Sequence, residues 1–288
     1  MSRPYRVPLP GGRALELGPR TLVMGILNIT PDSFADGGLH LDVDRAVAAG
    51  LAMAADGADI LDIGGESTRP GADPVPADEE LRRVLPVLER LAAETQVPLS
   101  IDTYKASVAR EAIARGATVV NDISGLQYDP DLGGVAADTG AALVLMHTRG
   151  RSKSMYSLAR YTDVAGEISR ELAEAIERAT SAGVRRDAIV VDPGLGFAKK
   201  AEHSYEALAA IGRIAERLDR PIVSGPSRKS FLTAAVGERV PDAREWATAA
   251  AVAASVLFGA HIVRVHGVAA MTDVVRIADR LLDIPPQA

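Results

Sequence analysis

Short apolar runs alternate with longer amphipathic stretches along most of the chain. Each run is rich in β-branched residues, and the stretch after it repeats apolar positions at the spacing of an α-helix. Strands that alternate with helices are typical of a parallel sheet in an α/β domain. We predict strands at residues 22–27, 60–63, 99–101, 119–120, 143–146, 189–191, 222–223 and 262–265. These eight strand and helix units predict a single (β/α)8 barrel of the TIM type.

Glycines mark the predicted ends of several helices. Gly57, Gly116, Gly140 and Gly259 each close an amphipathic stretch and are followed by Ala and an apolar run. Glycine at that place is a common helix C-cap. No long Pro- or Gly-rich linker interrupts the pattern, so we predict one barrel domain over residues 21–288.

Residues 1–20 do not fit the strand and helix repeat. Two short strand patterns, 6–9 and 14–17, flank Gly11 and Gly12, which predicts a β-hairpin before the first barrel strand. Such a hairpin could close the bottom of the barrel.

Composition narrows the class of protein. Hydrophobic residues make up 47% and charged residues 24% of 288 residues, which is typical of a globular domain with a sizeable core. A net charge of −6 without a long Lys/Arg run argues against nucleic-acid binding. The absence of cysteine excludes disulfides and thiolate chemistry. Prolines near the N-terminus and the short Ala-rich stretch at 247–258 argue against a signal peptide or a membrane span, so we predict a cytoplasmic protein.

Polar residues follow nearly every predicted strand. In a (β/α)8 barrel, the loops at the carboxyl ends of the strands build the active site. One such residue alone is more often a helix cap or a solvated loop residue, but their recurrence favours a site. They are Asn28, Asp62, Asp102, Asn121, Asp122, His147, Asp192, Ser227, Arg228, Lys229, Arg264 and His266.

The residue types indicate the kind of ligand. Acids and amides can bind the donor and acceptor edge of a polar heterocycle, whereas arginine, lysine and histidine suit phosphates. The five histidines lack the spacing of paired zinc ligands. The loop at 28–38 has the turn residues of a mobile lid, and the loop at 64–71 has those of an anion-binding frame. Both also fit ordinary surface loops. The loop after the seventh strand, with Ser227, Arg228 and Lys229, suits phosphate or a solvated helix start equally well.

Eight motifs, in order along the chain, resemble the dihydropteroate synthase family. They are T-P-D-S-F from Thr30, D-x-G-G-E-S-T-R-P-G-A from Asp62, S-I-D-T from Ser100, N-D from Asn121, M-H from Met146, D-P-G-x-G-F from Asp192, S-R-K from Ser227 and R-V-H from Arg264. The resemblance implies a transferase that joins 6-hydroxymethyl-7,8-dihydropterin diphosphate to 4-aminobenzoate, giving 7,8-dihydropteroate and diphosphate. It also implies a homodimer.

The same resemblance implies roles for individual residues. For the pterin these are Asp62, Asp102, Asn121, Met146, Asp192, Phe197, Gly225 and Lys229. For the diphosphate they are Asn28, Arg69, Arg264 and His266, with Asn28 also on Mg²⁺. For 4-aminobenzoate they are Phe34, Thr68, Pro70, Ser227 and Arg228, which replaces the generic assignment of the S-R-K loop to phosphate. The catalytic residues would be Asp102, Asn28, Lys229, Arg264 and His266.

One position departs from the family pattern. The chain has Ala198 where the family usually has glycine after D-P-G-x-G-F, which puts the loop geometry in doubt but removes no catalytic group. Two other functions share the pterin-binding residues, namely a pterin-binding methyltransferase module and a non-catalytic pterin-binding paralogue. The intact S-T-R-P and S-R-K loops argue against both. Because an arylamine is a weak nucleophile and a dihydropterin can delocalise positive charge, we expect diphosphate to leave before the amine attacks.

Overall fold

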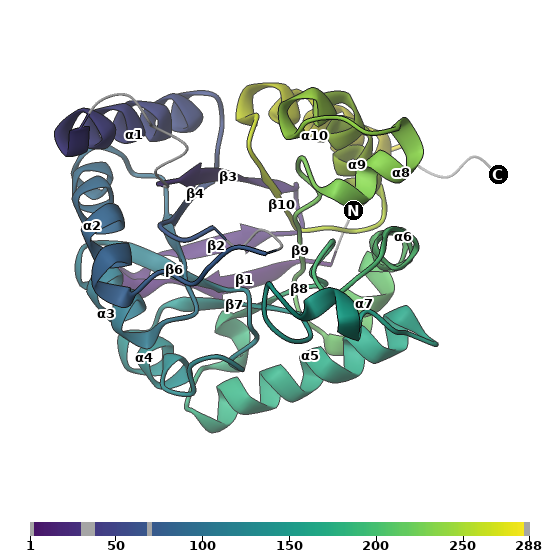
Figure 1. Ribbon diagram of the computed structural model, residues 1–288, viewed down its shortest axis with the longest axis horizontal. Coiled ribbons are helices and arrows are strands. Elements are labelled where there is room, and N and C mark those ends of the chain that lie inside the picture. Colours follow the sequence, from purple (N-terminus) through teal and green to yellow (C-terminus); the bar gives the residue numbers. More distant parts are fainter. Residues whose placement is uncertain (1–2, 30–37, 68–70, 285–288) are drawn as a thin grey trace.

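A parallel sheet of eight strands lies at the centre of the molecule and helices surround it (Figure 1). The computed structural model describes residues 3–29, 38–67 and 71–284. Around the sheet the strands follow their order in the chain. They are β3 (Leu22–Asn28), β4 (Ile60–Gly64), β5 (Leu99–Asp102), β6 (Ala117–Asp122), β7 (Ala142–Met146), β8 (Ile189–Asp192), β9 (Val223–Ser224) and β10 (Ile262–Val265).

Pairing between the first and last strands closes the sheet into a barrel. β10 pairs with β3, and a single parallel bridge between Val191 and Ile222 joins β8 to the segment that leads into β9. The predicted (β/α)8 barrel is therefore confirmed, and each predicted strand overlaps an observed one.

Helices connect successive strands and cover the outside of the barrel (Figure 1). They are α1 (Gly38–Ala55), α2 (Ala77–Glu94), α3 (Ala106–Ala114), α4 (Leu132–Thr139), α5 (Val164–Ser181), α6 (Ala201–Ala209), α7 (Ile211–Leu218), α8 (Thr233–Val236), α9 (Glu245–Leu257) and α10 (Val268–Leu282). Short 3-10 turns lie at Pro10–Gly12, Met155–Leu158, Arg186–Ala188, Ser230–Leu232 and Pro241–Arg244. The four predicted capping glycines all have positive φ, which is the backbone geometry expected of such caps.

The predicted N-terminal hairpin is present as β1 (Tyr5–Pro8) and β2 (Ala14–Leu17). Its apolar side chains, such as Val7 and Leu17, join a buried cluster with barrel residues such as Met24 and Val190. This cluster is separate from the larger core that the outer faces of the strands form with the helices. The hairpin therefore packs against the barrel interior, while the division into segments 1–20 and 21–288 stays a prediction. No helix in the described part of the chain is both long and apolar enough to cross a membrane.

Candidate active site

Strand register brings the predicted acids and amides together at the carboxyl ends of the strands. Asp102 at the end of β5 is the ladder partner of Asn121 on β6 and of Gly64 on β4. Met146 on β7 is likewise the partner of Asp192 on β8. Because neighbouring parallel strands lie about 5 Å apart, side chains that point inward at these levels face one another across the barrel.

Asp62, Asp102, Asn121 and Arg264 form a connected cluster, which we call the acid–arginine cluster. Asn121 donates its side-chain Nδ2 to Asp62 Oδ2 at 2.9 Å. Arg264 donates Nε to the same Asp62 oxygen and Nη2 to Asp102 Oδ2, each at 2.6 Å. All four side chains are buried or nearly so, with Arg264 the most exposed at 19%. One guanidinium therefore links two carboxylates that come from different strands.

Two carboxylate oxygens of the cluster have no hydrogen-bond partner among the described residues. Within the described residues, Asp62 Oδ1 and Asp102 Oδ1 are buried and accept no hydrogen bond. Burial raises the pKa of Asp102 despite the opposing effect of Arg264. Burial alone would lower the pKa of Arg264, but Asp62 and Asp102 outweigh it and raise that pKa. An unsatisfied buried carboxylate oxygen is costly, so these two atoms point to a ligand that donates hydrogen bonds.

Three further predicted pterin residues come from the ends of the next strands: Asp192 ends β8, Phe197 follows it, and Lys229 follows β9. Asp192 Oδ1 accepts a hydrogen bond from the backbone of Gly194 at 2.7 Å, and burial raises the pKa of this carboxyl. Lys229 donates Nζ to the carbonyl oxygen of Leu195 at 2.5 Å and lies over the Phe197 ring, 4.7 Å from its centroid. Burial lowers the pKa of Lys229 to about 8, although Asp192 opposes the shift. These contacts combine an aromatic wall with a cation that titrates near neutral pH.

The S-R-K loop contacts the segment that follows β10 and the start of α9. Ser227 Oγ and His266 Nδ1 lie 2.9 Å apart, which joins two predicted ligand-binding residues. Arg228 has a φ of 58° and its guanidinium is paired with Asp242 and Glu245. The Arg228 side chain is thus held toward the start of α9.

Asn28 lies at the end of β3, beside the acid–arginine cluster. A methyl group on Gly64 would lie 3.6 Å from Asp102 Oδ2 and 3.7 Å from Asn28 Oδ1, so both oxygens approach the same glycine. Gly225 is near as well, because a methyl group there would meet Arg264 Cβ and Lys229 Nζ, each at 3.8 Å. Phe34, Thr68, Arg69 and Pro70, predicted for 4-aminobenzoate and diphosphate, lie outside the described residues.

Two polar residues at strand ends do not face the barrel mouth. Asp122 accepts hydrogen bonds from the backbone of Ser124 and Leu126, at 2.7 Å and 2.6 Å, and so fixes its own turn. His147 is buried and bonds to Lys199 and Glu171. His261 is also buried, and its ring stacks edge-on against Tyr5.

A second, partly buried network was not predicted. Lys105 pairs with Glu66 and Glu80, and Tyr104 donates its hydroxyl to Glu66 at 2.9 Å. Glu66 belongs to the D-x-G-G-E-S-T-R-P-G-A motif, which was the only sequence signal for it. The network fixes the segment that leads into residues 68–70.

Comparison with known proteins identifies the family. Residues 24–266 match the family of pterin-binding enzymes. A dihydropteroate synthase from Synechocystis sp. is 44% identical over 275 residues, which cover 95% of each chain. The chain belongs to the dihydropteroate synthase family.

Solved structures of this family share the fold closely. Xanthomonas albilineans dihydropteroate synthase with 4-aminobenzoic acid superposes with a TM-score of 0.89 at 43% identity, covering 97% of this chain and 100% of that one. The same protein in complex with 7,8-dihydropteroate gives a TM-score of 0.85 at 40% identity, covering 96% of this chain and 100% of that one. The departure from the family pattern at Ala198 has a visible counterpart, since Ala198 has a φ of 48° where glycine would be unstrained.

Proposed function

We propose that this chain joins 6-hydroxymethyl-7,8-dihydropterin diphosphate to 4-aminobenzoate and releases 7,8-dihydropteroate and diphosphate. The observation that carries the proposal is the acid–arginine cluster, with two buried carboxylate oxygens that lack a donor within the described residues. A pterin ring offers N–H donors along one edge, and Asp62 and Asp102 offer matching acceptors. Family membership independently supports the same reaction.

The chemistry begins with loss of diphosphate. The bond between the exocyclic methylene and the diphosphate oxygen breaks, and its electron pair leaves with the oxygen. The remaining positive charge spreads over the dihydropterin ring, where the carboxylate of Asp102 stabilises it. The arylamine nitrogen then attacks the methylene and loses a proton. Asp192, Phe197 and Lys229 would hold the ring in place during both steps.

Positive side chains would stabilise the departing diphosphate. Arg264 and His266 follow one another on and after β10 with one residue between them, so both can face the mouth of the barrel. Arg69 is expected to add charge from its loop. Because Arg264 also bonds Asp62 and Asp102, it connects the ring end of the substrate with the phosphate end.

We propose that Mg²⁺ accompanies the diphosphate, with Asn28 as its protein ligand. No three His, Asp or Glu side chains in the described residues gather as a resident metal centre. A single amide oxygen is a sufficient protein contribution for Mg²⁺, which keeps several waters and binds substrate phosphates. When bound, the ion would neutralise charge on the diphosphate oxygens.

We propose that Ser227, Phe34, Thr68 and Pro70 line the aminobenzoate site, with Arg228 beside it. The contact of Ser227 with His266 supports this, because it sets the hydroxyl next to a residue expected at the diphosphate. The two reacting groups would then meet above the acid–arginine cluster.

We also propose a homodimer that uses α9 and α10. These two helices carry several exposed apolar side chains, and contiguous exposed apolar surface marks interaction sites. They are Trp246, Leu257, Ile277 and Leu281.

Diphosphate release is the direct test of the proposed reaction. Purified protein with the pterin diphosphate and Mg²⁺ should release diphosphate rapidly when 4-aminobenzoate is present, and 7,8-dihydropteroate should form in equal amount. A protein that binds the pterin but forms no dihydropteroate would instead be a pterin-binding module.

A further inference from the structure

Residues 192–199 form the loop that follows β8, which we call the pterin-facing loop. Lys199 is a buried lysine at the end of this loop, and it has no role in the proposed reaction. It is 1% exposed and ranks among the largest fully buried side chains of the described residues. Its Nζ lies 2.8 Å from His147 Nδ1 and donates to the carbonyl oxygen of Phe197 at 3.1 Å. Burial lowers the pKa of Lys199 well below its ordinary value. Removing a lysine ammonium group from water costs free energy, so its buried contacts indicate a structural role.

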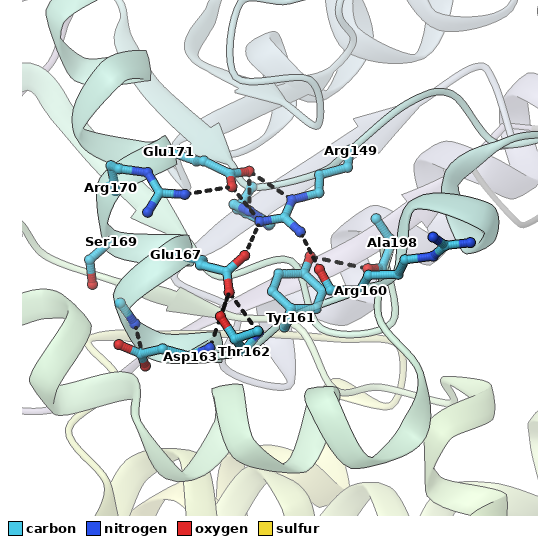
Figure 2. A network of polar contacts seen from close by, with 12 residues as sticks. Arg149, Arg160, Tyr161, Thr162, Asp163, Glu167, Ser169, Arg170, Glu171 and Ala198 are labelled. Carbon is cyan, nitrogen blue, oxygen red and sulfur yellow. Dashed lines mark hydrogen bonds and ion pairs between the residues drawn. The ribbon is translucent and has the colours of Figure 1, made fainter.

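The partner of Lys199 is a histidine whose tautomer is fixed from the surface. His147 Nε2 lies 3.0 Å from Glu171 Oε2, and Arg149 donates Nε to the same oxygen at 3.0 Å. Figure 2 shows Arg149 between Glu171 and Glu167. Because a carboxylate only accepts hydrogen bonds, Nε2 carries the histidine proton and Nδ1 accepts from Lys199. Burial also lowers the pKa of His147 to about 4, which keeps the ring neutral.

The same histidine holds the beginning of the loop. Its backbone N–H donates to the carbonyl oxygen of Asp192 at 2.9 Å. Its carbonyl oxygen lies so close to Gly194 that a methyl group on that glycine would be 2.0 Å away. His147 therefore contacts the loop at Asp192 and Gly194 through its backbone, and at Lys199 through its ring.

The end of the loop needs such a restraint because its backbone is strained. Ala198 has a φ of 48°, a conformation that costs an L-residue roughly 1–2 kcal/mol. Tyr161 donates its hydroxyl to the Ala198 carbonyl oxygen at 3.1 Å, as Figure 2 shows. Together with the bond from Lys199 to Phe197, this contact fixes the two residues that precede the lysine.

We propose that Lys199 is a positioning residue for the pterin: its bond to the Nδ1 atom of His147 fixes the loop so that Asp192 and Phe197 form one wall of the ring site. The inference rests on the proposed function, because it assumes that this wall binds a pterin. The cluster of Glu171, Arg149 and Glu167 acts from outside by holding the histidine tautomer. Loss of the link should weaken pterin binding and leave 4-aminobenzoate largely unaffected.

Substitutions at Lys199 test the proposal directly. Lys199→Met keeps the length of the side chain, removes the donor and avoids a buried charge, so the protein should still fold. Phosphate-free 6-hydroxymethyl-7,8-dihydropterin should bind about tenfold more weakly, as expected for the loss of one good hydrogen bond. The matched control is Lys200→Met at the next residue, which is exposed and should bind the pterin like the wild type.

Two substitutions of His147 separate its two contacts. In His147→Asn the amide oxygen can replace Nδ1 as the acceptor for Lys199, whereas in His147→Gln the amide N–H can replace Nε2 as the donor to Glu171. We expect the Asn variant to bind the pterin within about threefold of wild type, and the Gln variant to lose about tenfold, like Lys199→Met. If Lys199→Met does not fold, this pair decides the matter.

Two measurements apply to every variant: calorimetry with the phosphate-free pterin, and the Michaelis constant for the arylamine substrate at saturating pterin diphosphate. Unchanged pterin affinity in Lys199→Met, or equal losses in the two His147 variants, would overturn the proposal. An equal loss for both substrates would also overturn it, since that indicates general destabilisation. Failure of the wild type to bind pterin would instead overturn the proposed function.

Discussion

Replacing Asp102 with asparagine removes one negative charge from the acid–arginine cluster while keeping the size of the side chain. Above the raised pKa of Asp102, which is about 7, two carboxylates share one guanidinium and the net charge of the cluster is negative. In Asp102→Asn the remaining acid is balanced by Arg264 and the cluster becomes neutral. The amide oxygen can still accept the bond from Arg264, so the cluster should keep its geometry.

The charge contribution can be estimated from Coulomb's law. Two unit charges about 4 Å apart interact by about 4 kcal/mol at an effective dielectric constant of about 20. Partial cancellation by Arg264, which lies 2.6 Å from Asp102 Oδ2, leaves roughly 3 kcal/mol for a pterin cation. The rate constant for diphosphate loss should therefore fall by about 10²-fold. The uncharged ring loses only one acceptor, so its affinity should fall about tenfold.

Single-turnover measurement of diphosphate release is the appropriate assay, because it isolates bond breaking from product release. Release should be followed with and without 4-aminobenzoate, and pterin affinity should be measured by calorimetry on the same preparations. If attack and departure were concerted, little charge would form on the ring and the asparagine variant would retain most of its rate. A loss confined to pterin affinity would equally refute the charge-stabilising role of Asp102.

Three further outcomes are expected. Lys229 must be protonated to act as a cation, so kcat/KM for the pterin diphosphate should fall as pH rises through about 8. In Lys229→Arg this fall should move to higher pH, and an unchanged pH profile would contradict the assignment. Ala198→Gly should relieve the positive φ and stabilise the protein by about 0.5–1 kcal/mol in urea unfolding without changing activity; a loss of stability would show that the alanine conformation is not strained. Pterin diphosphate should bind before 4-aminobenzoate, since the acid–arginine cluster is already assembled by the strands; tight binding of 4-aminobenzoate to the protein alone, measured by calorimetry, would count against this order.

The barrel strands were predictable because buried parallel strands are short apolar runs between helices. The prediction agrees least well at β9, where the predicted strand 222–223 and the observed strand Val223–Ser224 share one residue. Ile222 makes only an isolated bridge to Val191, so its apolar character reflects burial more than membership of a ladder.

The candidate site was predictable as a set of strand ends but not as a set of contacts. Neighbouring residues on a strand face opposite sides, so Asn121 and Asp122 could not both point into the barrel. Asn121 bonds to Asp62, whereas Asp122 fixes its own turn. The pairing of Arg264 with both Asp62 and Asp102 depends on side chains that reach across several strands, and no local pattern encodes that reach.

The networks around Lys199 and Lys105 were missed for a related reason. A lysine in a sequence is most often solvent-exposed, and Lys105 and Lys199 differ from Lys200 only in what the fold places around them. Their acidic and histidine partners lie 25 to 52 residues away along the chain.

The position of Trp246 makes it an intrinsic fluorescence probe of the surface of α9. It is the only tryptophan in the sequence, it is 85% exposed on α9, and it directly follows Glu245, which pairs with Arg228. Its emission therefore does not report on packing in the barrel core, but it changes when another molecule covers this helix. Emission from a freely solvated indole lies at longer wavelength than emission from a covered one, so a dilution series without any label can follow self-association at α9.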